Sequence, residues 1–316
     1  MQRCNPVRET HYFPALTKLQ PRANSFSSSM LTLLLQPLSS VLDAPNVLLH
    51  RMPAGAIRRA RERFDVAIRP HLEAGLIESL EEKLVPCASL RHETHGNYFV
   101  MRGGSSTDYS KMRSSDLAWI SVDDMETWQD FREIFEESEV AKLVAPKVSP
   151  LHERVQLYSS FYVVRSRCSD ANWHADWPPG VGTSAWTLLA PIEEYTTDDF
   201  QLLYRDSSGK VEQYRYREGE GILFGSHFMH STEPGCAVDG AEAPHVFLCF
   251  TFGSDDLDFY EQHIAPTIGG YQSRIVVRAD GSVRLTEVGQ YLAEEGSEEN
   301  EEEAAPDPPG VGAASV

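Results

Sequence analysis

Hydrophobic residues recur at helical spacing in the first half of the chain. The stretch from Ala54 to Leu84 carries two apolar stripes: Ile57, Ala60, Phe64 and Ile68, then Leu72, Leu76 and Leu80. Spacings of three and four residues place side chains on one face of a helix. Pro70 lies inside the stretch, and proline removes a helical hydrogen bond. The pattern predicts a helical region that is kinked or split at Pro70.

A second helix is predicted immediately after Asp124. Ser121 and Asp124 form a capping-box pattern, and the acidic Asp123 and Asp124 suit the positive end of a helix dipole. Apolar residues then follow at helical spacing: Met125, Trp128, Phe131, Ile134 and Phe135. We interpret this stripe as a packing face and not as a cofactor-binding surface.

From Val155 onward the pattern changes to short strands rich in aromatic and β-branched residues. The predicted strands are Gln156 to Cys168, Ser184 to Ala190, Phe200 to Arg205, Val211 to Arg217, Ile222 to Phe224 and Val246 to Phe252. A hairpin turn is expected at Ser207 to Gly209, and a later hairpin from Arg274 to Leu285 turns at Asp280-Gly281. Many short strands at close spacing favour a sandwich or barrel over a parallel α/β sheet.

These patterns divide the chain into five stretches. The division is an irregular extension at 1–45, a helical N-terminal part that packs on the core at 46–150, a β core at 151–270, a hairpin with a short helix at 271–293, and an acidic tail at 294–316. The tail is rich in Glu, Pro and Gly, so we expect it to be disordered. The expected fold class is mainly β with flanking helices.

Composition narrows the choice of partners. The formal net charge is −19, and a surface of this sign repels phosphate backbones and anionic lipid. No apolar run reaches the roughly 18 residues of a membrane-spanning helix. We therefore expect neither nucleic acid nor a membrane to be a partner. The five cysteines form no CxxC pair, which indicates a reducing compartment and buried or idle thiols.

The N-terminus has two interpretations. Up to Gln36 it carries four basic residues against the single acid Glu9, with a serine-rich patch at Ser25 to Ser29. That composition is typical of an organellar transit peptide, but it also occurs in ordinary loosely packed extensions. The expected location is the cytoplasm, or an organelle if the segment is a transit peptide.

The residues that point to chemistry begin with His174 and Asp176. In an extended segment, residues two apart point to the same face, so both side chains can reach one point in space. One imidazole and one carboxylate make two thirds of a facial iron site, and a second histidine would complete it. His227 and His230 compete for that place.

The surroundings of His230 favour it as the third ligand. The segment Gly219-Glu-Gly-Ile-Leu-Phe-Gly-Ser-His-Phe-Met-His230 begins 43 residues after Asp176. Together with His174-Ala-Asp176, it resembles the iron(II)/2-oxoglutarate dioxygenase superfamily, in which an H-x-D motif precedes a G-[DE]-x-apolar-apolar-F-x-S-x-x-x-H segment. The matching residues are Gly219, Glu220, Phe224, Ser226 and His230. The resemblance covers roughly residues 158–252.

The resemblance implies a double-stranded β-helix, of the jelly-roll or cupin-like kind, in which His174, Asp176 and His230 are the catalytic Fe(II) ligands. It also implies that 2-oxoglutarate takes two of the open metal positions and dioxygen the third. The expected reaction is hydroxylation, because the family's halogenases carry a small residue where this chain has Asp176. We expect a small molecule as the substrate.

The chain departs from the family at the cosubstrate. Most members hold the distal carboxylate of 2-oxoglutarate with an Arg or Lys soon after the last histidine, but residues 231–252 contain neither. His245 lies near the expected position and is a weaker, pH-dependent partner. Arg165 and Arg205 on other strands are alternatives, and hydroxyl groups could assist them. The hydroxyl-bearing candidates are Tyr158, Tyr162 and Thr187.

Two other functions stay open at this point. The missing base allows an iron oxygenase of the same fold that does not use 2-oxoglutarate. A catalytically silent β-helix protein that binds a ligand is the third possibility, although it would have no need of all three metal ligands. Trp173, Trp177 and Trp186 near the metal motif fit either a pocket wall or plain packing.

Overall fold

The computed structural model describes residues 42–80, 83, 85–103, 117–165, 167–168, 171–195, 200–236, 245–268 and 272–290. The expected transit segment and acidic tail lie outside the described residues. Within the described part of the chain, no helix is long and apolar enough to cross a membrane.

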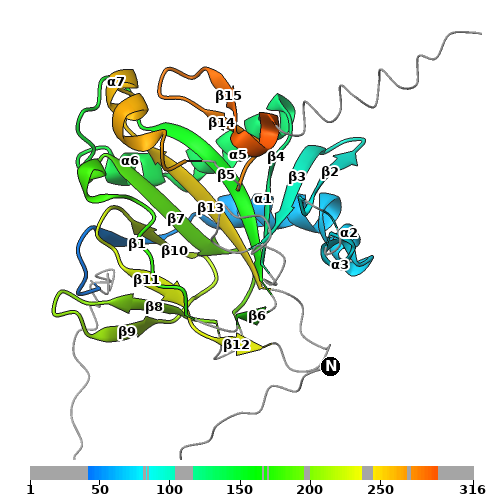
Figure 1. Ribbon diagram of the computed structural model, residues 1–316, viewed down its shortest axis with the longest axis horizontal. Helices are drawn as coiled ribbons and strands as arrows, with labels where there is room; N and C mark the ends of the chain where they lie inside the picture. Colours follow the sequence, from blue (N-terminus) through cyan, green and yellow to red (C-terminus); the bar gives the residue numbers. More distant parts are fainter. Residues whose placement is uncertain are drawn as a thin grey trace, which may run out of the picture. The chain divides into compact units, whose positions relative to one another are not determined.

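A large antiparallel sheet forms the centre of the described structure (Figure 1). Its eight described strands, in spatial order, are β1 (Val47–Arg51), β10 (Glu220–Phe224), β7 (Ala185–Pro191), β13 (His245–Gly253), β5 (Gln156–Arg165), β4 (Leu117–Val122), β3 (Gly96–Arg102) and β2 (Cys87–His92). The longest register joins β13 to β5, with β7 on the other side of β13.

A smaller layer of strands packs on one side of this sheet. It contains the three-stranded sheet β11 (His230–Thr232), β8 (Leu202–Arg205) and β9 (Val211–Tyr214), and the pair β12 (Gly235–Cys236) with β6 (Arg167–Cys168). Figure 1 shows these strands grouped below the large sheet. From β5 to β13 the chain alternates between the two layers. Such alternation of antiparallel strands is a jelly roll, so the predicted double-stranded β-helix is confirmed.

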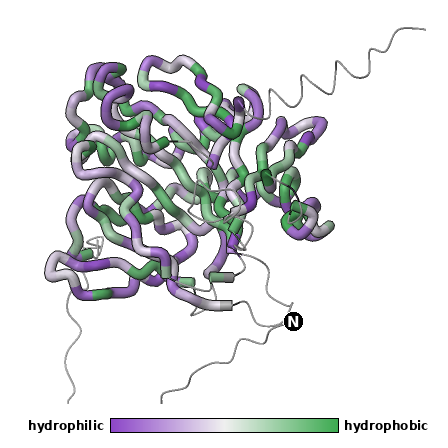
Figure 2. The backbone as a smooth tube through the Cα atoms, in the orientation of Figure 1, coloured by the Kyte–Doolittle hydropathy of each residue, from purple (hydrophilic) through white to green (hydrophobic). Residues whose placement is uncertain are grey.

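The helices cover the opposite face of the large sheet. They are α1 (Ala54–Ala67), α2 (Arg69–Glu73), α3 (Leu76–Ser79), α5 (Met125–Ser138) and α6 (Val140–Val144). Their apolar faces join one buried cluster with the outward side chains of the sheet. Figure 2 shows hydrophobic residues gathered along the central strands. A fully buried side chain such as Phe64 contributes about 1.5–3 kcal/mol to this packing.

The second apolar cluster fills the space between the two layers, and it fixes which strand residues face inward. On β5, Phe161 and Val163 belong to this interior cluster, whereas Tyr162 and Val164 belong to the cluster under the helices. Because strand residues alternate between faces, Arg165 follows Val163 into the interior. This parity places Arg165 and Tyr162 on opposite sides of the sheet.

A third apolar cluster closes one end of the fold. It gathers around α7 (Leu257–Phe259) and the π-helical turn η2 (Tyr260–Ile264), against the 3-10 turn η1 (Pro179–Val181). The hairpin β14 (Ile275–Val277) and β15 (Val283–Leu285) packs nearby, and Gly281 takes a φ of 84° at its turn. The predicted late hairpin is therefore confirmed, and residues 287–290 begin a helix after it.

The structure differs from the sequence predictions at two places. The stretch 46–150 was expected to be helical, yet it also contributes β1 to β4 to the large sheet. Helix α5 is capped by Asp124, whose side chain accepts from the Thr127 N–H at 2.8 Å. Ser121 lies in β4, so it is not the cap. The predicted break at Pro70 is present, because α1 ends at Ala67 and α2 begins at Arg69.

Candidate metal centre

The backbone brings the two histidines of the motif together. The His174 N–H donates to the His230 carbonyl at 3.0 Å, and the His230 N–H donates to the His174 carbonyl at 2.9 Å. On its other side His230 pairs with Tyr204 of β8. Residues opposite each other in an antiparallel pair point to the same face. Both imidazoles therefore project together into the space between the layers.

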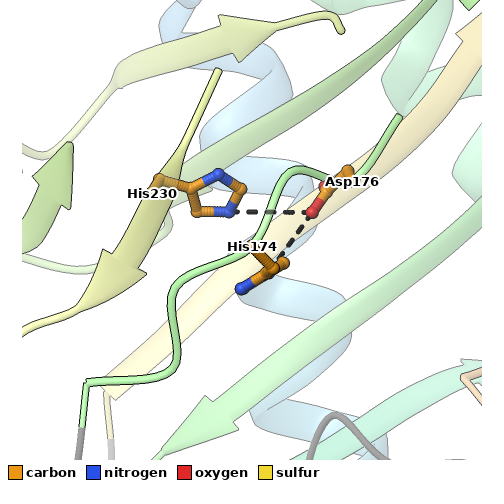
Figure 3. A group of neighbouring side chains, drawn as sticks. All are labelled: His174, Asp176 and His230. Carbon is orange, nitrogen blue, oxygen red and sulfur yellow. Dashed lines mark ion pairs between the residues drawn. The ribbon is translucent and has the colours of Figure 1, made fainter. Parts of the chain in front are cut away.

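Three ligand atoms converge at this point (Figure 3). Asp176 Oδ1 lies 3.4 Å from His174 Nε2 and 3.6 Å from His230 Nε2. The three ligand atoms all lie within 4.8 Å of one another. His227 is not part of this group: it is exposed and holds a φ of 69° in the turn before β11. The geometry thus brings His230, and not His227, to the motif.

The other ring nitrogen of each histidine has a backbone partner. His174 Nδ1 lies 2.7 Å from the Asn172 carbonyl, and His230 Nδ1 lies 3.1 Å from the Phe228 carbonyl. A carbonyl oxygen can only accept, so each Nδ1 carries the hydrogen when the imidazole is neutral. Each Nε2 is then left with a lone pair aimed at the common point, as metal-binding histidines require.

The second oxygen of Asp176 is held from the strand behind it. Thr187 Oγ1 of β7 donates to Asp176 Oδ2 at 2.9 Å, and Trp177 Nε1 donates to Thr187 Oγ1 at 3.1 Å. Thr187 was expected to assist the cosubstrate. The structure instead places its hydroxyl between Trp177 and Asp176.

The pKa values of the three groups are shifted by burial and by one another. Burial raises the pKa of Asp176, but the hydrogen bond that His174 Nε2 donates when the imidazole is protonated and the charge of a protonated His230 outweigh burial and lower the pKa to about 2. Burial lowers the pKa of His230. Burial also acts to lower the pKa of His174, but the hydrogen bond to Asp176 outweighs it and the pKa is raised. The carboxylate is ionised at neutral pH, and this negative charge attracts a cation.

The donor set fits a divalent metal ion. Two neutral imidazole nitrogens and one carboxylate oxygen on one side of a point form the facial arrangement typical of non-haem iron(II) sites. The His174 side chain is 44% exposed and the His230 side chain only 8%. The centre is therefore open on the His174 side and closed on the His230 side.

Arg165 is the basic candidate that faces the same interior. Its charge adds to burial in lowering the pKa of His230 and acts against the rise in the pKa of His174, and it also interacts electrostatically with Tyr216 and Tyr195. Burial lowers the pKa of Arg165 itself. Among the described residues, none forms a hydrogen bond or ion pair with its guanidinium. Arg165 is half-buried, and an inward cation of this kind is stabilised when a ligand supplies the counter-charge.

The other candidates for the cosubstrate occupy different surroundings. Tyr162 faces the helices and donates to the Ala60 carbonyl at 2.9 Å. Tyr158 packs in the end cluster and donates to the Ser254 carbonyl. Arg205 is exposed and lies 4.7 Å from the ring centre of Trp173. His245 pairs with Arg165 across β13 and β5, and its ring stacks on Tyr195 at 4.5 Å.

The tryptophans near the motif are packing residues of different clusters. Trp186 is buried on the helix side of β7 and donates to the Thr183 carbonyl. Trp177 is buried in the end cluster, and Trp173 stacks with Arg205.

Sequence reasoning missed Tyr216, which is buried beside Phe247 in the interior and interacts with Arg165. Tyr214 and Tyr216 are two residues apart and both buried, and this alternation in the sequence could have indicated that Tyr216 faces the interior.

Comparisons with known proteins give likenesses only at the level of solved structures. No family model matches the sequence, and no curated protein matches it. One similar structure is the non-heme alpha ketoglutarate dependent epimerase SnoN from nogalamycin biosynthesis, with 10% identity over 66% of this chain and 78% of that one, at a TM-score of 0.40. HygX from Streptomyces hygroscopicus, solved with nickel and 2-oxoglutarate bound, is 11% identical over 74% of this chain and 94% of that one, at a TM-score of 0.40. A Pseudomonas putida prolyl-4-hydroxylase is 10% identical over 66% of this chain and 92% of that one, at a TM-score of 0.36.

In its sequence motif, the chain resembles the iron(II)/2-oxoglutarate oxygenases. That resemblance rests on the H-x-D and distal histidine motif, which the jelly roll assembles into one site. Identities of 10–11% do not establish a shared activity, so the function is proposed from the site.

Proposed function

We propose that this protein is a non-haem iron(II) oxygenase that uses 2-oxoglutarate and dioxygen. The observation that carries the proposal is the convergence of His174 Nε2, His230 Nε2 and Asp176 Oδ1, each within 4.8 Å of the others. The remaining polar atom of each side chain is already satisfied by the Asn172 carbonyl, the Phe228 carbonyl or Thr187.

The protein's part in the reaction is to hold the metal and to leave positions open for reactants. Iron(II), when bound, supplies the activation of dioxygen that is coupled to decarboxylation of 2-oxoglutarate. His174, Asp176 and His230 would hold the ion from one side and leave the opposite side available. The interior cluster around Phe224 and Phe228 borders His230 and excludes water from that side.

Arg165 is proposed as the partner of the distal carboxylate of 2-oxoglutarate. A planar guanidinium matches a carboxylate bidentately. Arg165 faces the interior, acts electrostatically on both metal-binding histidines and has no ionic partner among the described residues. Tyr162 and Arg205 do not share these surroundings, and the Thr187 hydroxyl is occupied. His245 pairs with Arg165 across the strands, and Tyr216 interacts with it electrostatically.

Hydroxylation of a small molecule is the proposed reaction. Asp176 supplies a carboxylate where a halogenating enzyme of this kind needs a vacant position. The net charge of −19 disfavours polyanionic substrates such as nucleic acids.

The test is an anaerobic titration. Purified protein is loaded with Fe(II) without oxygen, 2-oxoglutarate is added, and the metal-to-ligand charge-transfer band is recorded. We expect a band in the wild type, none with His174→Ala, and a strongly raised 2-oxoglutarate requirement with Arg165→Met. Arg205→Met, a matched change at an exposed arginine, should leave the titration unchanged.

Other results point to other functions. Iron binding without a band would favour an iron oxygenase that does not use 2-oxoglutarate. A wild type that binds no iron would leave a ligand-binding protein of the same fold.

A further inference from the structure

We propose that Thr187 and Trp177 are positioning residues that hold Asp176 to the metal through one oxygen only. The inference rests on the proposed function insofar as it assumes that the His174, Asp176 and His230 group binds a metal ion. It assigns a role to two buried residues outside that group.

The direction of each hydrogen bond follows from the chemistry of the donors. An indole Nε1 can only donate, and a threonine hydroxyl has one hydrogen. Because Trp177 Nε1 donates to Thr187 Oγ1 at 3.1 Å, the hydroxyl oxygen acts as an acceptor there. The hydroxyl hydrogen is then free to donate to Asp176 Oδ2, which lies 2.9 Å away. The indole thus fixes the hydroxyl as a donor toward the carboxylate.

The two oxygens of Asp176 therefore have different partners. Oδ2 is occupied by Thr187, whereas Oδ1 faces His174 Nε2 at 3.4 Å and His230 Nε2 at 3.6 Å. The Thr187 hydrogen bond engages one of the two lone pairs of Oδ2 and draws this oxygen toward β7, so we expect it to favour binding through Oδ1. Binding through one oxygen would leave more of the metal open to a cosubstrate and dioxygen than binding through two.

The surroundings make this arrangement rigid. Thr187 is 3% exposed and lies in the middle of β7, between Phe224 of β10 and Thr251 of β13. A β-branched side chain has few χ1 choices at such a position. Trp177 is 2% exposed and packs in the end cluster with Tyr158 and Tyr260. Solvent therefore competes poorly for either hydrogen bond, and the carboxylate orientation is set before a metal arrives.

The experiment compares paired substitutions by titration of metal-free protein with Co(II). Thr187→Val keeps the side-chain shape and removes the hydroxyl. Its control is Thr251→Val, because Thr251 faces Thr187 across the sheet but bonds to the Ser159 carbonyl. Trp177→Phe removes the indole donor. Its control is Trp186→Phe, an equally buried tryptophan that donates to the Thr183 carbonyl.

We expect Thr187→Val to weaken Co(II) binding by about 10–100-fold, the usual loss when a hydrogen bond to a metal ligand is removed. Trp177→Phe should cause a smaller loss, and Thr187→Ser, which retains the hydroxyl, should restore most of the affinity. The visible Co(II) spectrum should change with Thr187→Val as the second oxygen approaches the ion. The two control variants should match the wild type in affinity and spectrum.

The outcomes separate this role from the proposed function. If the wild type binds Co(II) and Thr187→Val binds it equally well with the same spectrum, the positioning role is overturned and the metal site stands. If the wild type binds no divalent ion, the proposed function falls and the positioning role falls with it. Should Thr187→Val fail to fold, the difference between Trp177→Phe and Trp186→Phe decides: equal affinities overturn the role, and a loss confined to Trp177→Phe supports it.

Discussion

His174 and His230 exchange both of their backbone hydrogen bonds although 55 residues separate them in the sequence. The proposed metal site therefore depends on the pairing register of His230 with His174 and with β8 in the small layer. A slip of one residue would turn one imidazole to the outer face. Asp176 follows His174 by two positions and shares its face. The pairing of His174 with His230 therefore brings all three side chains together.

Replacing His230 by Ala should abolish metal binding. The substitution removes one of three ligand atoms, and losses from outer hydrogen-bonding partners alone reach about 10–100-fold; a ligand should cost more. Isothermal titration with Co(II) measures the effect. His227→Ala is the matched control, because His227 lies three residues earlier, is exposed and stands outside the ligand group. Loss of binding with His227→Ala and not with His230→Ala would contradict the ligand assignment.

The sequence was sufficient to predict which three side chains converge, because their signal is local. His174-Ala-Asp176 fixes a common face by alternation, and the spacing from Phe224 to His230 selects one of two histidines. The jelly roll then follows from many short strands, each ended by turn residues. The hairpin at Gly281 was predictable for the same reason.

The cosubstrate candidates could not be sorted from the sequence because β5 is apolar on both faces. Residues 156–164 of this strand are all buried, with Phe161 and Val163 between the layers and Tyr162 and Val164 under the helices. Alternation shows that Tyr162 and Arg165 point opposite ways, but it does not say which face is the interior. Strand β1 was missed because its partner β10 comes much later in the chain. Strands β2 to β4 pair with their neighbours in the sequence, and a prediction based on helical spacing in this stretch passed over them.

Tyr162→Phe should reduce stability without affecting 2-oxoglutarate binding. The Tyr162 hydroxyl donates to the Ala60 carbonyl of α1, and its loss leaves that buried bond unmade at a cost of about 1 kcal/mol. The ring still packs against Phe64 at 5.2 Å. Urea unfolding and the anaerobic 2-oxoglutarate titration measure the two properties. A raised 2-oxoglutarate requirement at unchanged stability would show that Tyr162 reaches the cosubstrate after all.

Asp255→Asn should destabilise the fold mainly at neutral pH. Asp255 accepts backbone N–H bonds from His152, Glu153 and Arg154, at 2.7, 2.6 and 2.9 Å. Burial acts to raise the pKa of Asp255, but these bonds outweigh it and lower the pKa. A group whose pKa is lower in the folded state stabilises above its unfolded pKa of about 3.9. This contribution is lost as the pH falls through the folded pKa.

The loss with Asp255→Asn should be roughly 1.5–3 kcal/mol at neutral pH, the range for hydrogen bonds to a charged group. Urea unfolding at pH 7 and below pH 4 measures it, and the difference from the wild type should shrink at the lower pH. Asp258→Asn, at an exposed aspartate of α7, is the control and should change little. A difference that grows on acidification would refute the assigned role of the carboxylate.

Gly253→Ala should be among the more damaging glycine substitutions, since Gly253 lies where β13 and β7 come closest. An added Cβ would stand 2.1 Å from the Ser184 carbonyl oxygen and 2.8 Å from Ala185 Cα, and both are backbone atoms that cannot rotate away. The strands must shift, at a cost of roughly 2–3 kcal/mol. Because β7 also carries Thr187, we expect the shift to weaken Co(II) binding as well.

Gly55→Ala is the contrasting change: no heavy atom lies within 4 Å of its added Cβ, and alanine favours helix α1 by about 0.5–1 kcal/mol. Urea unfolding followed by circular dichroism should give opposite signs for the two variants, and a neutral Gly253→Ala would mean that the β13–β7 contact is looser than the structure has it.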